Sequence, residues 1–295
     1  MAKSLITSRP FWLAPLVAGG VFLALLLAEK RRPLRDQREP WQKRTARNLT
    51  MAGLSAVAAM TLQNSLLVPL TRSIEENHMG LLQQLRLAPI VRTAVGVLML
   101  DYTLWWWHWL NHKVPLLWRF HLVHHVDRDL DASTALRFHF GEMSLSVLYR
   151  MAQMFLLGID RNALAVWNLM LMVSILFHHS NLRLDPRIER LLVRLIVTPR
   201  MHGIHHSDYQ KETDSNWSSL LSCWDALHGT LKLNIPQDDL TIGVPAYQEP
   251  DTVTIGKIIS LPFIAQRADW VGDDGTPKVD RTVPGANIDP ATLAP

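Results

Sequence analysis

Three short histidine boxes are the part of this chain whose residue types and spacing point most directly to chemistry. Eleven of the thirteen histidines lie between residues 108 and 206. The boxes read His-Trp-Leu-Asn-His at 108–112, His-Leu-Val-His-His at 121–125 and His-Gly-Ile-His-His at 202–206. Because helical residues three or four apart share a face, each box directs two or three imidazoles the same way. The predicted metal ligands are His108, His112, His121, His124, His125, His202, His205 and His206.

Eight imidazole nitrogens are too many for one tetrahedral ion and indicate two metal ions that share a site. A lone histidine in an apolar stretch is usually a hydrogen-bonded core residue, and a histidine-rich tract can be a flexible tail that sequesters metal. Three boxes with this spacing, separated by apolar helices, fit neither alternative. A buried cluster of histidines without metal would leave many polar atoms unpaired. We therefore expect a buried metal site.

The segments that must position these boxes are apolar and of the length that a membrane requires. Residues 11–28, 51–70 and 87–109 predict three membrane spans. The runs at 142–157 and 163–177 are too short to cross comfortably and predict a short membrane hairpin. The expected fold is therefore all-α: an integral membrane helical bundle of about three spans plus a short hairpin, with a cytoplasmic, helical, histidine-rich metal site.

The distribution of charge predicts the orientation of this bundle. The first apolar run is followed by Glu-Lys-Arg-Arg and not by a small-residue cleavage site, so we expect a retained anchor instead of a signal peptide. The loop at 30–47 carries eight Lys and Arg against two acidic residues, whereas the loop at 71–86 is almost balanced. The positive-inside rule places the first loop and the histidine boxes in the cytoplasm. The membrane would be a bacterial inner membrane or an ER-like membrane.

Composition divides the chain into three parts and excludes several classes of protein. Residues 1–107 are expected to be membrane anchor spans, 108–232 a catalytic domain that includes the hairpin at 142–177, and 233–295 an irregular cytoplasmic tail that is disordered beyond about residue 268. No glycine pattern for nucleotides and no cluster of lysines with aromatic residues is present, so no nucleic-acid partner is expected. The single cysteine, Cys223, excludes an intramolecular disulfide and thiolate-cluster metal sites.

Five ordered motifs within residues 95–232 resemble the membrane fatty acid hydroxylase/sterol desaturase superfamily, whose members are histidine-box diiron oxygenases. The first motif contains the first two boxes, at 107–125. The others are Arg-Phe-His-Phe-Gly-Glu at 137–142, Phe-His-His-Ser-Asn at 177–181, the last box within 198–207, and a closing element at 216–230. The closing element usually has Phe where this chain has His228.

The resemblance implies an enzyme that hydroxylates or desaturates a lipid with two iron ions, O2 and two electrons. It also implies a metal site on the cytoplasmic side. Because no cytochrome b5-like or ferredoxin-like segment is visible, the electrons would come from a separate donor protein. Glu142 would act as a catalytic residue that orients a ligand imidazole or positions an iron-bound species. The residues that could complete the two coordination spheres are His139, His178 and His179.

Two other classes of function remain open at this point. One is a membrane hydrolase with zinc in the histidine site and Glu142 as a general base. The other is a non-catalytic protein that binds metal or lipid. For the lipid oxidation hypothesis, we expect a narrow apolar tunnel beside the metals. The residues predicted to form its wall are Trp105, Trp109, Leu145, Leu148 and Trp167.

Overall fold

The computed structural model describes residues 13–281, and within this range every regular element is helical. The prediction of an all-α fold is therefore confirmed for the described part of the chain. The longer helices are α1 (Leu13–Arg31), α2 (Trp41–Leu62), α3 (Val68–Glu76), α5 (Pro89–Lys113), α6 (Pro115–His125), α7 (Phe140–Leu157) and α8 (Arg161–His179). The shorter ones are α4 (Leu81–Gln84), α9 (Pro186–Leu192), α10 (Pro199–His205), α11 (Gln210–Thr213), α12 (Cys223–His228) and α13 (Ile255–Ser260). A π-helical turn, η1 (Gln63–Leu67), joins α2 to α3.

Two segments of the described residues are long and apolar enough to cross a membrane. One is the continuous stretch from Trp41 to Gln84, and the other is α8. The first contains the predicted span at 51–70. Helix α8 belongs to the predicted hairpin and is 19 residues long, so the expectation that both of its arms are too short was wrong for this arm. Helix α5 forms as a helix where a third span was predicted, but it does not reach this hydropathy, and residues 11–12 of the first predicted run lie outside the described range.

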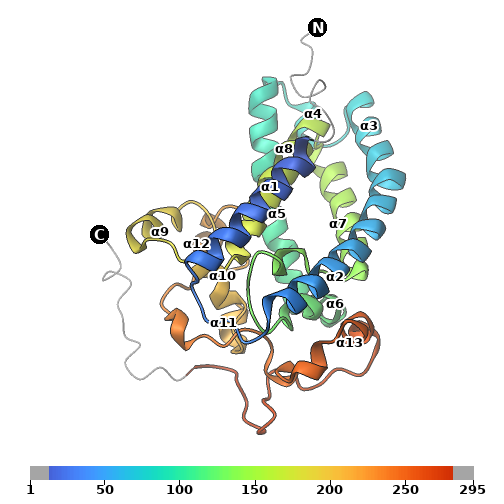
Figure 1. Cartoon of the computed structure of the whole chain (residues 1–295). Coiled ribbons are helices and arrows are strands. Elements are labelled where there is room, and N and C mark those ends of the chain that lie inside the picture. Colours follow the sequence, from blue (N-terminus) through green and yellow to red (C-terminus); the bar gives the residue numbers. More distant parts are fainter. Residues whose placement is uncertain (1–12, 282–295) are drawn as a thin grey trace.

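The long helices form two groups that face each other. Helix α2 packs against α7, whereas α1 and α5 pack against α8 (Figure 1). At one end, the backbone N–H of Arg35 donates to Oδ1 of Asn181 (2.9 Å), so the α1–α2 loop contacts the end of α8. At the other end, Gln83 Nε2 donates to the carbonyl of Gly158 (2.9 Å) in the α7–α8 turn. The basic loop therefore lies at the same end of the bundle as the shorter helices α9–α13.

The α7–α8 turn and the α3–α4 turn each require a glycine where they meet. Gly158 has a φ of 71° and Gly80 a φ of 83°, both in the region that side chains disfavour. A Cβ atom on Gly80 would lie 2.3 Å from the backbone nitrogen of Gly158. The close approach of these two backbones fixes the distal end of the bundle.

The bend between α5 and α6 brings the first two histidine boxes together. Pro115 opens α6, and its ring disfavours helical geometry at Val114, which is extended at φ −97° and ψ 115°. The chain therefore turns at this point while α6 starts afresh. Box one ends α5 and box two ends α6, and the turn brings the two boxes into contact: the ring centroids of His112 and His125 are 4.8 Å apart.

The C-terminal segment packs onto the domain that carries the histidines. Val244, Tyr247 and Ile258 are buried in one apolar core with Met51 of α2 and Leu122 of α6. Further along, Trp118 donates from Nε1 to Asp269 Oδ2 (2.8 Å), and Lys278 forms an ion pair with Asp208. The prediction of disorder beyond residue 268 was therefore wrong for residues 268–281, because these contacts hold the segment. Residues 282–295 lie outside the described range.

Candidate metal centre

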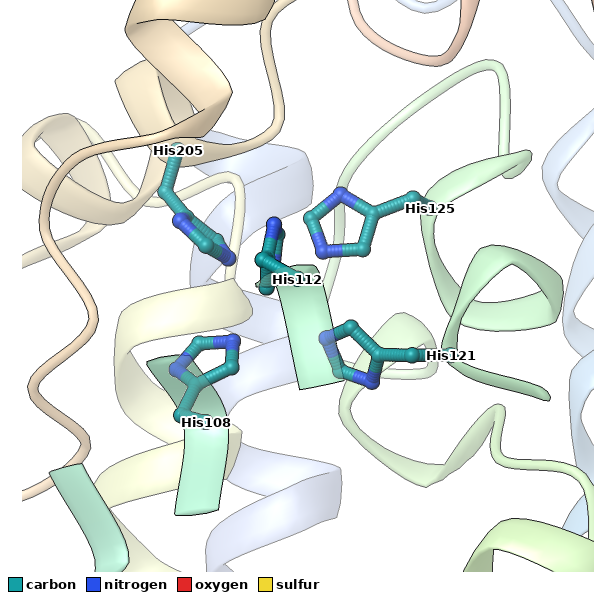
Figure 2. A group of neighbouring side chains, drawn as sticks. All are labelled: His108, His112, His121, His125 and His205. Atoms are coloured by element: carbon teal, nitrogen blue, oxygen red, sulfur yellow. The ribbon is translucent and has the colours of Figure 1, made fainter. Parts of the chain in front are cut away.

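Nine histidines converge in two groups within the described part of the chain. In each group, one ligand atom of every residue lies within 4.8 Å of those of the others. The rings of the first group point toward a common centre from α5, α6 and α10 (Figure 2). The first group consists of His108, His112, His121, His125 and His205. The second group consists of His124, His179, His202 and His206.

The second and third boxes are each divided between the two groups. His121 and His125 are four residues apart on α6 and join the first group, whereas His124 joins the second. In the third box, His205 joins the first group, and His202 and His206 join the second. A spacing of four keeps two rings on one face of a helix, and the residue between them points to a neighbouring face. Two adjacent sites are therefore built from the same helical turns.

Hydrogen bonds at Nδ1 fix three rings of the first group. Nδ1 of His108 lies 2.8 Å from the carbonyl of Trp217, and Nδ1 of His205 lies 2.7 Å from the carbonyl of Ser215. Nδ1 of His121 lies 2.8 Å from Oε1 of Glu142. Each partner is an acceptor, so the ring hydrogen is assigned to Nδ1 and the lone pair to Nε2. Metal-ligating histidines are commonly held in this way.

The free nitrogens of the first group match what a metal ion needs. The Nε2 atoms of His112, His121, His125 and His205 are buried and have no hydrogen-bond partner among residues 13–281. Buried polar atoms are rarely left unpaired, because each costs about 1–3 kcal/mol. A bound cation would satisfy all four lone pairs at once. The donor set of this group therefore fits a metal ion.

The second group places its nitrogens closer together. Nε2 of His179 lies 3.1 Å from Nε2 of His124 and 3.0 Å from Nε2 of His202, which is in turn 3.1 Å from Nε2 of His206. Nδ1 of His179 is held by the carbonyl of Ile175 at 2.7 Å. Four imidazole nitrogens that face one another at this distance also fit a metal ion. An all-nitrogen set suits iron or zinc, so the ligand types alone leave both metals open.

Burial keeps the imidazoles at the ends of α6 and α10 neutral. It lowers the pKa of His124, His125, His202 and His206 well below the ordinary value, and neighbouring imidazoles add to the effect. Burial likewise lowers the pKa of His205 to about 3. Only the neutral ring has a lone pair to give to a metal. At neutral pH these imidazoles are therefore uncharged and have a lone pair available for a cation.

His139 and His178 lie outside both groups. His139 precedes α7, where its Nδ1 accepts from the backbone N–H of Gly141 (2.9 Å) and its Nε2 lies 3.1 Å from the carbonyl of Ile259. Both of its nitrogens are therefore in use, and it caps the helix. His178 packs its ring on that of His202, with centroids 4.1 Å apart. Of the eleven predicted ligands, the structure therefore brings nine together and leaves these two aside.

A buried ion-pair network, which the sequence analysis did not predict, fixes the loop after the second box. Arg44 of α2 is fully buried and donates from Nη1 to Oδ2 of Asp127 at 3.1 Å, and it also pairs with Asp131. Asn48 donates to the same Asp127 oxygen at 2.9 Å. Burial alone would raise the pKa of Asp127, but the charges of Arg44, Arg137 and Arg47 outweigh it and hold the pKa at about 2. Helix α2 thereby anchors the chain two residues beyond His125.

The closing element supports His108 through a second network. Oδ1 of Asp225 accepts from Nε1 of Trp105 (2.9 Å) and from the backbone N–H of Trp217 (3.0 Å). The carbonyl of Trp217 is the partner of His108. His228 stacks on Trp105 at 4.0 Å with an interplanar angle of 15°. The imidazole therefore occupies an aromatic packing position and has no contact with the two groups of histidines.

A cavity of about 640 Å³ adjoins the histidines and is enclosed mainly by α2, η1, α5, α7 and α8. Its wall is largely apolar, with Leu104, Leu164 and Leu171 among its members. The histidines on the wall are His108, His121, His124, His178, His179 and His202. A tunnel beside the metals was predicted, but of its five predicted wall residues only Trp167 lines this cavity. Trp105 is buried elsewhere and Leu148 is 52% exposed, whereas Trp109 and Leu145 are simply not on the wall.

Similarity to known proteins is concentrated in the part of the chain that carries the histidines. The fatty acid hydroxylase family model matches residues 93–230. Ornithine lipid hydroxylase OlsE of Rhizobium tropici is 30% identical over 156 residues, which are 52% of this chain and 45% of that protein. Alkylglycerol monooxygenase of Xenopus tropicalis is 30% identical over 141 residues, 47% of this chain and 29% of that protein. A cholesterol 25-hydroxylase-like protein of Danio rerio is 30% identical over 141 residues, 47% of this chain and 54% of that protein.

No solved structure matches the chain. The chain spans about half or less of the length of these relatives. The range 93–230 nevertheless contains both groups of histidines, Glu142 and the closing element. This histidine-bearing region is therefore similar to the fatty acid hydroxylase family, in line with the resemblance that its five motifs indicated.

Proposed function

We propose that this chain is a membrane-bound diiron oxygenase that hydroxylates a C–H bond of a lipid with O2 and electrons from a separate donor protein. The observation that carries the proposal is the contact between two metal-binding groups of histidines and one apolar cavity of about 640 Å³. A cavity of this size and character suits a lipid chain. The printed names of the relatives, all hydroxylases or monooxygenases, favour hydroxylation over desaturation.

In this proposal, the first group of histidines holds one iron ion and the second group holds the other. Bound iron would supply the activation of O2 and the oxidising power that an unactivated C–H bond requires. The protein contributes position and environment. The Nδ1 contacts of His108, His121 and His205 hold these rings in place, and the apolar wall excludes water from the reacting carbon.

Glu142 acts in this scheme as a positioning residue for His121. Its Oε1 accepts the Nδ1 hydrogen of His121, which leaves Nε2 of that ring free for metal. Its Oε2 is buried and has no hydrogen-bond partner in the described residues. A carboxylate behind a ligand imidazole increases the basicity of the ring and fixes its tautomer.

The bundle would lie in a membrane with its histidine end on the cytoplasmic side. The spans would be formed by α1, the α2–α3 stretch, α5 and the α7–α8 pair. The loop at 30–47, with its eight Lys and Arg, lies at the histidine end, which supports this orientation. The same basic face would suit an acidic electron-donor protein.

One experiment separates this function from its alternatives. Full-length protein is purified with its membrane lipids, its metal content is measured, and lipids from cells with and without the gene are compared by mass spectrometry. The proposal expects bound iron and lipids that gain one oxygen in the presence of O2. A zinc protein that cleaves lipids without O2 would instead be a hydrolase, and bound metal with an unchanged lipid profile would indicate a non-catalytic protein.

A further inference from the structure

A positively charged side chain with no counter-ion among the described residues forms part of the cavity wall. Arg150 of α7 lines the cavity, and its guanidinium stacks on the ring of Trp167 at 3.9 Å. Its Nη1 atom is buried and has no hydrogen-bond partner among residues 13–281. In that range the guanidinium also forms no ion pair. Charged residues inside a membrane protein are costly and are normally paired, so this one is expected to meet a partner that enters the cavity.

Trp167 provides a second unpaired donor at the same place. Its Nε1 atom is buried and lacks an acceptor within the described part of the chain, and the residue is only 1% exposed. The indole N–H can only donate a hydrogen bond. Two neighbouring donors on the cavity wall, one of them charged, therefore have no hydrogen-bond partner among the described residues. Buried donors are almost always satisfied, so both observations point to an oxygen ligand with negative charge.

The position of Arg150 along α7 separates this pair from the candidate metal centre. Glu142, which contacts His121, and Arg150 are eight residues apart on the same helix, a rise of about 12 Å. Apolar side chains, including Val147 and Leu171, line the cavity as well. A ligand that reaches both places would therefore carry its charge at one point and its reacting carbon at another.

We propose that Arg150 and Trp167 form a subsite for an oxyanion of the lipid substrate, either a carboxylate or a phosphate. The planar guanidinium suits both groups because it can donate two parallel hydrogen bonds. The proposal rests on the proposed function in so far as the bound lipid is the substrate. The distance from this subsite to the histidines then decides which carbon is oxidised.

Binding of three probes with the same alkyl chain tests the charge requirement without any turnover. Iron-loaded, full-length protein in detergent is titrated with tritium-labelled hexadecanoic acid, and unlabelled hexadecyl phosphate and hexadecan-1-ol compete. At least one anionic probe should bind about 10-fold or more tightly than the alcohol, because a charge-assisted hydrogen bond contributes that much. Preference for the carboxylate or the phosphate identifies the source of the oxyanion. Equal binding of all three probes would overturn the proposal.

Variants then locate the subsite. Arg150→Met should remove the preference for anions and leave binding of the alcohol unchanged. Trp167→Phe keeps an aromatic ring but loses the N–H, and should weaken anion binding about 2–10-fold. Arg72→Met is the matched control, because Arg72 is exposed on α3 and is not part of the cavity wall. If Arg72→Met lowers anion binding as much as Arg150→Met, the subsite is misplaced.

Stability and activity measurements keep the two proposals distinct. Iron content and thermal unfolding show whether each variant is folded. If Arg150→Met does not fold, the comparison of the three probes on the unaltered protein still shows whether the cavity prefers an anion. Lipid oxidation without any preference for anions would defeat the subsite alone. A preference for anions in a protein that oxidises no lipid would instead leave the subsite in place and defeat the proposed function.

Discussion

Nδ1 of His121 and Oε1 of Glu142 lie 2.8 Å apart, and both side chains are almost completely buried. This contact joins α6, which carries the second box, to the first turn of α7. It is also the point at which the carboxylate predicted from the sequence meets the metal centre. A test of this contact is therefore a test of how the ligands are held.

Replacement of Glu142 should affect metal binding before it affects folding. Glu142→Ala removes the partner of His121, and loss of such a partner typically lowers metal affinity about 10–100-fold. Glu142→Gln keeps an acceptor oxygen and should retain more affinity than the alanine variant. Competition with a chelator measures the iron affinity of the unaltered protein and of both variants, and so ranks the three proteins. Equal affinity in all three proteins would exclude the positioning role.

His205→Ala and His139→Ala should differ in iron content, although both substitutions remove a buried imidazole. His205 belongs to the first group, so its loss should lower the iron content from about two per chain to about one or less. His139 bonds only to protein atoms, so the second variant should keep its iron while it loses some stability. Metal analysis of both purified variants provides the comparison. Loss of iron from His139→Ala would return that residue to the list of ligands.

Arg44→Met should destabilise the fold strongly. The side chain is fully buried between Asp127 and Asp131, so its removal leaves Asp131 without an ion pair among the described residues and Asp127 with Arg47 and Arg137 alone. Breaking a buried ion pair in this way costs about 3–5 kcal/mol. Unfolding in detergent, followed by fluorescence, measures the loss. Lys43→Met in the same helix removes an exposed charge and should change stability by less than about 0.5 kcal/mol.

Leu104→Trp should narrow the cavity and alter the choice of lipid. Leu104 lies on the wall, and one methylene of pocket space is worth about 1–3 kcal/mol in selectivity. The ratio of products from long and short chains should therefore shift by about 10-fold or more. Leu148→Trp is the control, because Leu148 is 52% exposed and does not contribute to the wall. An unchanged product ratio in a folded Leu104→Trp protein would place the substrate elsewhere.

The proposed orientation is accessible to chemical labelling. In a Cys223→Ser background, a cysteine at the exposed position of Asp274 should react with a membrane-impermeant maleimide only after the membrane is opened. Asn77→Cys, near the opposite end of the bundle, should react in intact cells because the residue is exposed there. The reverse pattern would invert the topology.

The convergence of the histidines could be predicted from the sequence because their spacing follows local rules. A spacing of three or four residues defines a helical face, and all eight ligands predicted from the boxes lie in the two groups. His178 and His179 could not be separated in this way. Neighbours on a helix point in directions about 100° apart, and the packing of α8 decides that His179 and not His178 joins the second group.

The supporting residues could not be predicted because their partners are distant in the chain. Arg44 and Asp127 are separated by 83 positions, and Trp105 and Asp225 by 120. The wall of the cavity was likewise mostly misassigned. Periodicity shows that Leu148 is apolar and helical, but which face of α7 looks inward depends on how α2 packs against it.

The division of the second and third boxes between the two groups has a consequence for how the metals are acquired. His124 and His125 are consecutive residues, yet they belong to different groups, and the same is true of His205 and His206, so in the proposed diiron site they would bind different ions. When one ion orders a turn of α6 or α10, it also orders ligands of the other. The first ion should therefore increase the affinity for the second, so that at limiting iron the protein is a mixture of empty and fully loaded molecules with few singly loaded ones.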